Sequence, residues 1–111
     1  MVARNDQETE VTIEEFNEIV NNSHKLVVVD FFAEWCMPCL MLAPVIEELA
    51  EQMPDIKFVK LNTDENRELA SKFRISSIPC LIIFKNGKEV DRIIGAQNQD
   101  AIEEKLNSYL D

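Results

Sequence analysis

The chain has 111 residues, of which 46% are hydrophobic, and this size and composition predict one domain spanning residues 1–111 with a single core. Its formal net charge of −10 argues against binding to nucleic acid or to an anionic membrane, because both depend on clustered lysine and arginine. Three cysteines are too few, and odd in number, for the disulfide framework of a small secreted domain.

Residues 1–10 are mostly polar and are expected to be weakly ordered. They contain no apolar run of the kind that marks a secretory signal, and the apolar stretches further on have only the length of strands. Together with the few cysteines, these features favour a reducing, cytoplasmic setting.

The first predicted elements are a helix and a buried strand. Thr12 and Glu15 have the spacing of a capping box, and apolar residues follow at helical spacing as far as residues 21–23. Leu26–Phe32 is short, nearly all apolar and rich in β-branched and aromatic residues. Such a run predicts a strand that is buried on both faces.

A long helix and a second strand are predicted next. Residues 36–53 carry an apolar stripe at helical spacing, and residues 56–61 alternate as a strand does. A strand–helix–strand unit of this length predicts two parallel strands joined by a right-handed crossover. Asp64 is then expected to cap a short helix that ends near Phe73.

The last third of the chain predicts a hairpin and a final helix. Asn86-Gly87 stands between the apolar runs 81–84 and 89–94, which favours two antiparallel strands joined by a tight turn. The final helix is predicted over residues 99–110. Taken together, the elements predict an α/β fold with a central mixed sheet and helices on both faces.

The most informative motif is Trp35-Cys36-Met37-Pro38-Cys39, which lies between the first buried strand and the long helix. A CxxC pair in that setting is typical of a redox dithiol. Cys36 is expected at the helix N-terminus, where unpaired backbone N–H groups and the helix dipole stabilise a thiolate. We therefore expect Cys36 to attack a substrate disulfide, and Cys39 to resolve the resulting mixed disulfide.

A zinc half-site or an inert structural pair is the alternative interpretation of the two cysteines. A closed zinc site needs four ligands, and the chain offers Cys80 and His24 besides the pair. The setting of the motif favours the redox interpretation.

Over nearly its whole length the chain resembles the thioredoxin family. The segment from Asp30 to Cys39 resembles the active-site segment of that family, and shorter matches follow in the family's order: Lys60-Leu61-Asn62, Ile78-Pro79, Phe84-Lys85-Asn86-Gly87 and Gly95-Ala96. The resemblance implies a thioredoxin fold and a monomeric electron carrier that reduces protein disulfides. The chain has no GxGxxG motif and its 111 residues already account for one domain, so we expect no cofactor and electrons supplied by a separate thioredoxin reductase. A disulfide oxidase or isomerase is the alternative redox function.

Asp30 is an acid within an apolar strand. Burying an ionised carboxylate is costly, so its pKa is expected to be raised, and such a carboxyl can accept the proton of Cys39. An acid at the strand end that reaches solvent is the alternative. The resemblance assigns the proton-accepting role to Asp30, with Lys60 as its partner.

The resemblance also implies that Pro79 is a cis-proline facing the dithiol. There it would leave the backbone of Ile78 free to pair with an extended substrate. A flat, mostly apolar docking surface is expected from these residues: Trp35, Met37, Pro38, Ile78, Gly95 and Ala96. Core packing is the alternative for Trp35.

Two residues depart from the family's pattern. Met37 replaces the usual glycine, and we expect it to shift the redox potential modestly and to enlarge the docking surface. Cys80 replaces the threonine that commonly follows the cis-proline, and a small buried side chain is the plainer interpretation. The alternatives for Cys80 are a disulfide with Cys36, or a place with Cys36 and Cys39 as a ligand of a metal or iron–sulfur cluster shared across a dimer.

Overall fold

The computed structural model describes residues 8–110. Its helices and strands follow in this order: β1 (Thr9–Glu10), α1 (Ile13–Asn22), β2 (Leu26–Phe32), α2 (Met37–Gln52), β3 (Ile56–Asn62), α3 (Arg67–Lys72), β4 (Cys80–Lys85), β5 (Lys88–Ile94) and α4 (Gln99–Asn107). The helices and strands that the sequence predicts are therefore all present.

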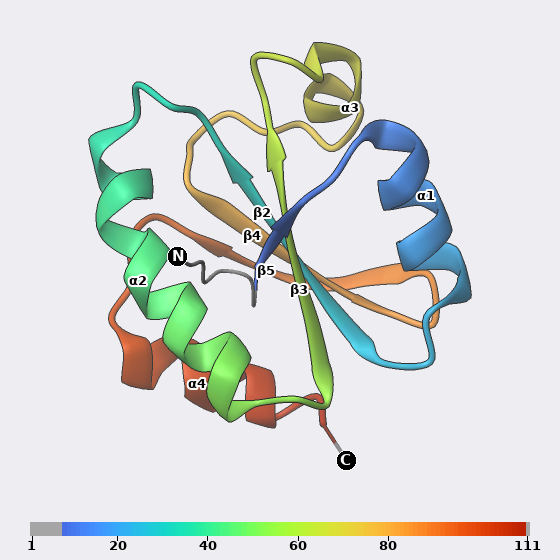
Figure 1. The fold of residues 1–111 in the computed structure, drawn as a ribbon, viewed down its shortest axis with the longest axis vertical. Coiled ribbons are helices and arrows are strands. Elements are labelled where there is room, and N and C mark those ends of the chain that lie inside the picture. The colour runs from blue at the N-terminus through green and yellow to red at the C-terminus, as the bar shows by residue number, and fades with distance from the viewer. Residues whose placement is uncertain (1–7, 111) are drawn as a thin grey trace, which may run out of the picture.

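The strands form one mixed sheet in the order β1-β3-β2-β4-β5 (Figure 1). β1 and β2 both run parallel to β3, whereas β4 is antiparallel to β2 and β5 is antiparallel to β4. β2 lies in the middle of the sheet, and all its residues except Phe32 are buried, as its apolar run predicts.

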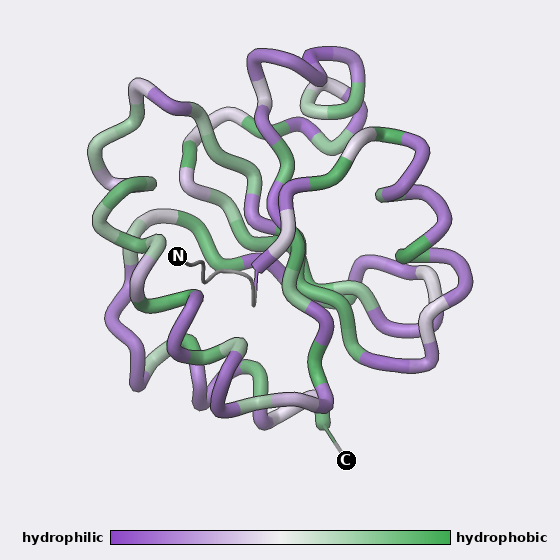
Figure 2. Tube along the Cα trace, in the orientation of Figure 1, coloured by the Kyte–Doolittle hydropathy of each residue, from purple (hydrophilic) through white to green (hydrophobic). Residues whose placement is uncertain are grey.

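Successive side chains of β2 point to opposite faces of the sheet and enter two separate cores. Val28 packs in the core with Ile46 of α2, whereas Phe31 packs in the core with Phe16 of α1 and Leu69 of α3. Figure 1 shows α2 and α4 on one side of the sheet and α1 and α3 on the other. In Figure 2 the central strands are mostly hydrophobic, while the helices alternate in hydropathy along their length. The predicted α/β architecture is confirmed.

Two local sequence signals fold as predicted. Thr12 and Glu15 form a reciprocal capping box: the N–H of Thr12 donates to Glu15 Oε1 (2.9 Å), and the N–H of Glu15 donates to Thr12 Oγ1 (3.2 Å). Asn86 and Gly87 both have positive φ, at 55° and 83°, which the primed turn of a two-residue hairpin requires. These signals are local, so the sequence alone suffices to read them.

Two expectations about element boundaries were wrong. Asn66, not Asp64, precedes α3, and the turn before it forms because Asn62 Oδ1 accepts from the N–H groups of Asp64 (2.8 Å) and Glu65 (3.2 Å). The carboxylate of Asp64 instead accepts a hydrogen bond from the indole N–H of Trp35. α4 ends at Asn107 rather than at residue 110.

The start of the described chain is also more ordered than expected. Thr9 and Glu10 form β1 and lie opposite Val59 and Lys60 of β3, and the Val11 N–H continues the pairing with the Lys60 carbonyl (3.0 Å). Glu8, just before the strand, is buried. The expectation of weak order over residues 1–7 lies outside the described residues.

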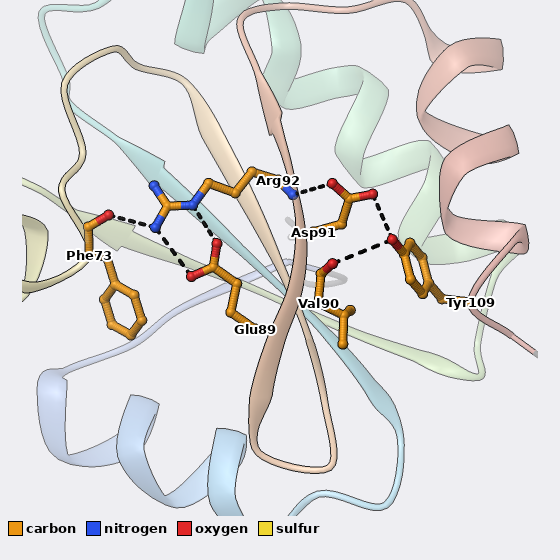
Figure 3. Close-up of polar contacts among 6 residues, drawn as sticks. All are labelled: Phe73, Glu89, Val90, Asp91, Arg92 and Tyr109. Carbon is orange, nitrogen blue, oxygen red and sulfur yellow. Dashed lines mark hydrogen bonds and ion pairs between the residues drawn. The ribbon is translucent and has the colours of Figure 1, made fainter.

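The edge strand β5 is tied to both helical layers by side chains that point in opposite directions (Figure 3). Arg92 donates to the carbonyl of Phe73, after α3, at 2.6 Å and forms an ion pair with Glu89. Asp91 accepts from the Tyr109 hydroxyl, after α4, at 2.7 Å. These charged contacts anchor an edge that hydrogen bonds to only one neighbouring strand.

Candidate active site

The dithiol lies at the N-terminus of α2, directly after β2. Cys36 is the N-cap residue and is bonded to Cys39 by a disulfide, with a Cα–Cα distance of 5.2 Å. The N–H of Cys39 points at Cys36 Sγ (3.2 Å), and the N–H of Leu40 donates to the Cys36 carbonyl (3.1 Å). Cys36 therefore receives a backbone donor and faces the positive end of the helix dipole, both of which stabilise a thiolate after reduction.

Both sulfurs lie within a small apolar cluster. Cys36 and Cys39 are only 4% and 7% exposed, and they pack with Ala33, Phe32 and Ile78. Apolar side chains surround the disulfide and keep water away from it. Thiol–disulfide exchange therefore depends on a partner that can reach Cys36 from outside.

The loop before β4 completes the site, because β4 is antiparallel to β2 and begins beside the end of β2. The Ile78–Pro79 peptide bond is cis, as the resemblance implied, and the carbonyl oxygen of Ile78 lies 3.8 Å from Cys36 Sγ. The N–H of Gly95 donates to the carbonyl of Pro79 (2.9 Å), which brings Gly95 and its neighbour Ala96 to the same edge. Gly95 adopts a φ of 88°, and its surroundings leave room for a Cβ, so backbone conformation rather than space favours glycine there.

The outer surface around the dithiol is apolar and exposed. Trp35 is 71% exposed and Met37 is 63% exposed, so core packing of Trp35 is excluded. Leu40 (57%) and Met41 (67%) extend the same surface and were not anticipated. Their positions off the buried stripe of α2 are the signal that could have found them. Figure 2 shows that the tube is hydrophobic over this first part of α2.

Trp35 is held in place by Asp64, which follows β3. Its indole Nε1–H donates to Asp64 Oδ2 at 2.8 Å. This contact joins two segments 29 residues apart, so no local pattern could have revealed it. We name Trp35, Met37, Leu40 and Met41 the apolar rim of the dithiol.

Replacing Asp64 by alanine is expected to release the Trp35 ring. A lost charge-assisted hydrogen bond is worth about 1–3 kcal/mol, so the ring should gain mobility and the catalytic efficiency toward protein disulfides should fall roughly threefold or more. Trp35 is the single tryptophan of the chain, so fluorescence anisotropy reports its mobility directly. Glu65→Ala, which removes the adjacent exposed acid, is the matched control. An Asp64→Ala variant with unchanged anisotropy and efficiency would show that the contact does not position the ring.

Asp30 is buried in the centre of the sheet, only 5% exposed, so the solvent-reaching alternative is wrong. Strand alternation places its side chain on the same face as Val28 and Phe32. Val28 packs against α2, and Phe32 packs against the dithiol cluster, so Asp30 lies between them beneath the first half of α2. Burial raises its pKa to about 6.

Lys60 lies opposite Asp30 in the β2–β3 register. Its ammonium is 5.3 Å from the centre of the Phe32 ring, and its positive charge lowers the pKa of Asp30 against the larger effect of burial. The structure therefore brings the predicted pair, Asp30 and Lys60, to the same face of the sheet as the dithiol cluster.

Glu8 is a further residue of the site that the sequence pattern did not reveal. It is only 5% exposed, and burial together with the Asp30 charge raises its pKa to about 10. Because it sits in a polar segment before a two-residue strand, no pattern of alternation marks it as buried.

Cys80 lies apart from the dithiol. Its side chain belongs to the core between the sheet and the helices α1 and α3, with Phe31 and Ile82, and is free and buried. Burial raises the pKa of its thiol, which keeps it neutral. Among residues 8–110, no group of three or more His, Cys, Asp or Glu side chains comes together as metal ligands. The structure thus favours the plainer interpretation of Cys80 as a small buried side chain, and none of the described residues joins Cys36 and Cys39 as a third metal ligand.

A disulfide across one turn at a helix N-terminus, at the carboxyl end of the central strand of a mixed α/β sheet and beside a cis-proline, defines a thiol–disulfide oxidoreductase. Residues 7–108 match the family model described as Thioredoxin. The chain belongs to the thioredoxin family, and its CxxC pair is the redox-active pair of a thioredoxin-type protein-disulfide reductase.

Individual relatives agree with this assignment. The chain is 50% identical to thioredoxin-2 of Saccharomyces cerevisiae over 94 residues, which cover 85% of this chain and 89% of that protein. It is 45% identical to the thioredoxin of Porphyra purpurea over 103 residues, covering 92% and 96% of the two chains. The crystal structure of the thioredoxin NaTrxh from Nicotiana alata superposes with a TM-score of 0.89 at 32% identity, covering 98% of this chain and 97% of that one.

Proposed function

We propose that this chain, as a monomeric single domain in the cytoplasm, reduces disulfides in other proteins and is itself re-reduced by a thioredoxin reductase. The observation that carries this proposal is the Cys36–Cys39 disulfide at the N-terminus of α2, with the N–H of Cys39 directed at Cys36 Sγ. The net charge of −10 supports protein partners over nucleic acid. In residues 8–110 no helix is long and apolar enough to cross a bilayer.

In the proposed mechanism Cys36 is the nucleophile of the reduced protein. Its thiolate attacks one sulfur of the substrate disulfide, so a Cys36–substrate S–S bond forms and the other substrate sulfur leaves as a thiolate. The Cys39 thiol then gives its proton to Asp30 and attacks Cys36 Sγ. The Cys36–Cys39 bond forms, the second substrate sulfur leaves, and two electrons have passed to the substrate.

Docking is proposed to use the cis-proline edge together with the apolar rim. The carbonyl of Ile78 lies beside Cys36 Sγ and can pair with an extended substrate backbone, held in position by Pro79 and the Gly95-Ala96 turn. Met37 and Pro38 are exposed at the start of α2, beside this edge. Mobile thioether and aromatic side chains suit a surface that must accept many different partners.

The double variant Leu40→Ser/Met41→Ser is expected to slow the reduction of protein disulfides selectively. Removing two exposed apolar side chains of the rim should lower the catalytic efficiency toward a folded protein disulfide roughly tenfold, because rim contacts are made only with a large partner. The rate with a small aromatic disulfide such as Ellman's reagent should change by less than about twofold. Glu48→Ser/Glu51→Ser, at exposed positions near the far end of α2, is the matched control. Equal losses with both substrates would contradict a docking role.

The direct test of the proposed function compares reduction with oxidation. The protein is incubated with NADPH, a thioredoxin reductase and insulin, and free insulin thiols are counted by alkylation and mass spectrometry. We expect insulin to be reduced catalytically, and the reverse reaction, oxidation of a reduced unfolded protein by the disulfide form, to be much slower. Efficient oxidation together with poor reduction would favour the oxidase or isomerase alternative.

A further inference from the structure

Two carboxyl groups are buried together on the α2 side of the sheet. Glu8 and Asp30 are each 5% exposed, and each shifts the pKa of the other. Glu10 of β1 lies opposite Lys60, and alternation puts Glu8 on that same face. The pair thus lies on the face that carries the dithiol helix.

Three of the four carboxyl oxygens of the pair lack a hydrogen-bond donor among the described residues. Both carboxyl oxygens of Glu8 and the Oδ1 of Asp30 are fully buried, and none of them accepts a hydrogen bond from an N–H or hydroxyl group of the described residues. A buried acceptor without a donor costs about 1–3 kcal/mol, and a buried charge costs more. A proton retained on one of the two carboxyls supplies the missing donor to the other.

The charges around Glu8 and Asp30 favour a pair that holds one proton at neutral pH. Lys60 is the cation that acts on both carboxyls and lowers both pKa values, while Glu47 of α2 raises that of Glu8. Glu10 is exposed opposite Lys60, and Cys39 in the first turn of α2 becomes a titratable thiol once the disulfide is reduced. One lysine cannot stabilise two buried carboxylates, so the first proton leaves the pair near pH 6 and the second is held through the neutral range.

We propose that Glu8 is a positioning residue for disulfide exchange: its protonated carboxyl donates a hydrogen bond to the carboxylate of Asp30 and keeps Asp30 in the form that accepts the proton of Cys39. This inference rests on the proposed role of Asp30. In the resolving step the Cys39 S–H bond breaks, the proton passes to the pair, the Cys36–Cys39 bond forms, and the substrate leaves as a thiolate that takes a proton from water. After the step both carboxyls are protonated, and the pair returns its extra proton to solvent.

The test uses two substitutions of Glu8 with opposite expectations. Glu8→Gln keeps an N–H donor for Asp30 but removes the ionisable group. Glu8→Leu removes the donor as well. Glu10→Gln, two residues away on an exposed side chain, is the matched control. Each protein is titrated by ¹³C NMR of its side-chain carboxyls, which does not depend on activity.

The wild-type protein and Glu10→Gln should each show two carboxyl groups with raised pKa values. Glu8→Gln should lack the titration with the higher pKa, while the pKa of Asp30 stays unchanged. In Glu8→Leu the Asp30 titration should move upward by about one pH unit, because its donor is gone. A single raised carboxyl in the wild type, or two in Glu8→Gln, would overturn the proposal.

The second readout is the pH profile of resolution under single turnover with Ellman's reagent, which releases one coloured thiol on attack and another on resolution. In Glu8→Leu the acid limb in the pH–rate profile of the second thiol release should move to higher pH, together with the pKa of Asp30. At pH values below this limb the second release should be about tenfold slower than in the wild type. An acid limb that stays in place in Glu8→Leu would overturn the role in exchange. A wild-type protein that never releases the second thiol would instead defeat the proposed function itself, while leaving the carboxyl titrations readable.

Discussion

A Cys39→Ser variant is expected to stop after its first chemical step and to accumulate a covalent complex with its substrate. Cys36 keeps its place at the N-terminus of α2, so its attack on a disulfide is preserved. The serine hydroxyl cannot serve as the resolving nucleophile at neutral pH, since only a thiolate attacks a disulfide at a useful rate. Turnover should fall at least about 10³-fold, because an intramolecular thiol at one turn's distance has a high effective concentration.

Intact mass spectrometry measures this outcome directly. Cys39→Ser should carry one substrate mass per chain, released by a small thiol, whereas Cys36→Ser should carry none. Cys80→Ser is the control, because that thiol is buried on the opposite face of the sheet and should leave turnover unchanged. A stable substrate adduct on Cys36→Ser would contradict this account, because it would show that Cys39 can attack the substrate disulfide first.

Asp30→Asn is expected to stabilise the folded protein at neutral pH while slowing resolution. The pKa of Asp30 is raised from an ordinary value of 3.8 to about 6, so the folded state holds this proton after the unfolded chain has released it. Stability from this group is therefore complete below about pH 4 and is lost as the pH rises through 6. Asparagine cannot ionise, and removing the buried charge should raise the free energy of unfolding at pH 8 by roughly 2–3 kcal/mol.

Denaturant unfolding of the oxidised protein at pH 4 and pH 8 provides the measurement. The gain from Asp30→Asn should be large at pH 8 and nearly absent at pH 4, where wild-type Asp30 is also neutral. Asp55→Asn, at an exposed position before β3, should change neither value by more than about 0.5 kcal/mol. A gain of equal size at both pH values would mean that packing, and not charge, explains it.

The sequence predicts those features of this molecule that local patterns specify. The apolar run of β2, the capping box at Thr12 and the Asn86-Gly87 turn each act through neighbours in the chain, and each is confirmed. The position of the dithiol at a helix N-terminus follows from the same reasoning, because the strand ends and the helix begins on either side of it.

The features that escaped prediction depend on long-range contacts. Asp64 was expected to cap α3, but the Trp35 ring, 29 residues away, takes its carboxylate. Glu8 is buried because β1 pairs with β3 and α2 covers that face, neither of which is visible in a two-residue strand. The face on which Cys80 lies was also not predictable, because the apolar run predicts a strand that begins at residue 81. Since β4 begins at Cys80, strand alternation places its side chain on the α1 and α3 side.

The most direct test is a redox titration of the Cys36/Cys39 couple, read by alkylation and intact mass. For a protein-disulfide reductase we expect a midpoint potential near the value of about −270 mV that is typical of thioredoxins, with Met37 shifting it by no more than about 30 mV. A midpoint near about −180 mV or higher, as in isomerases and oxidases, would contradict the assignment of this chain as a reductase.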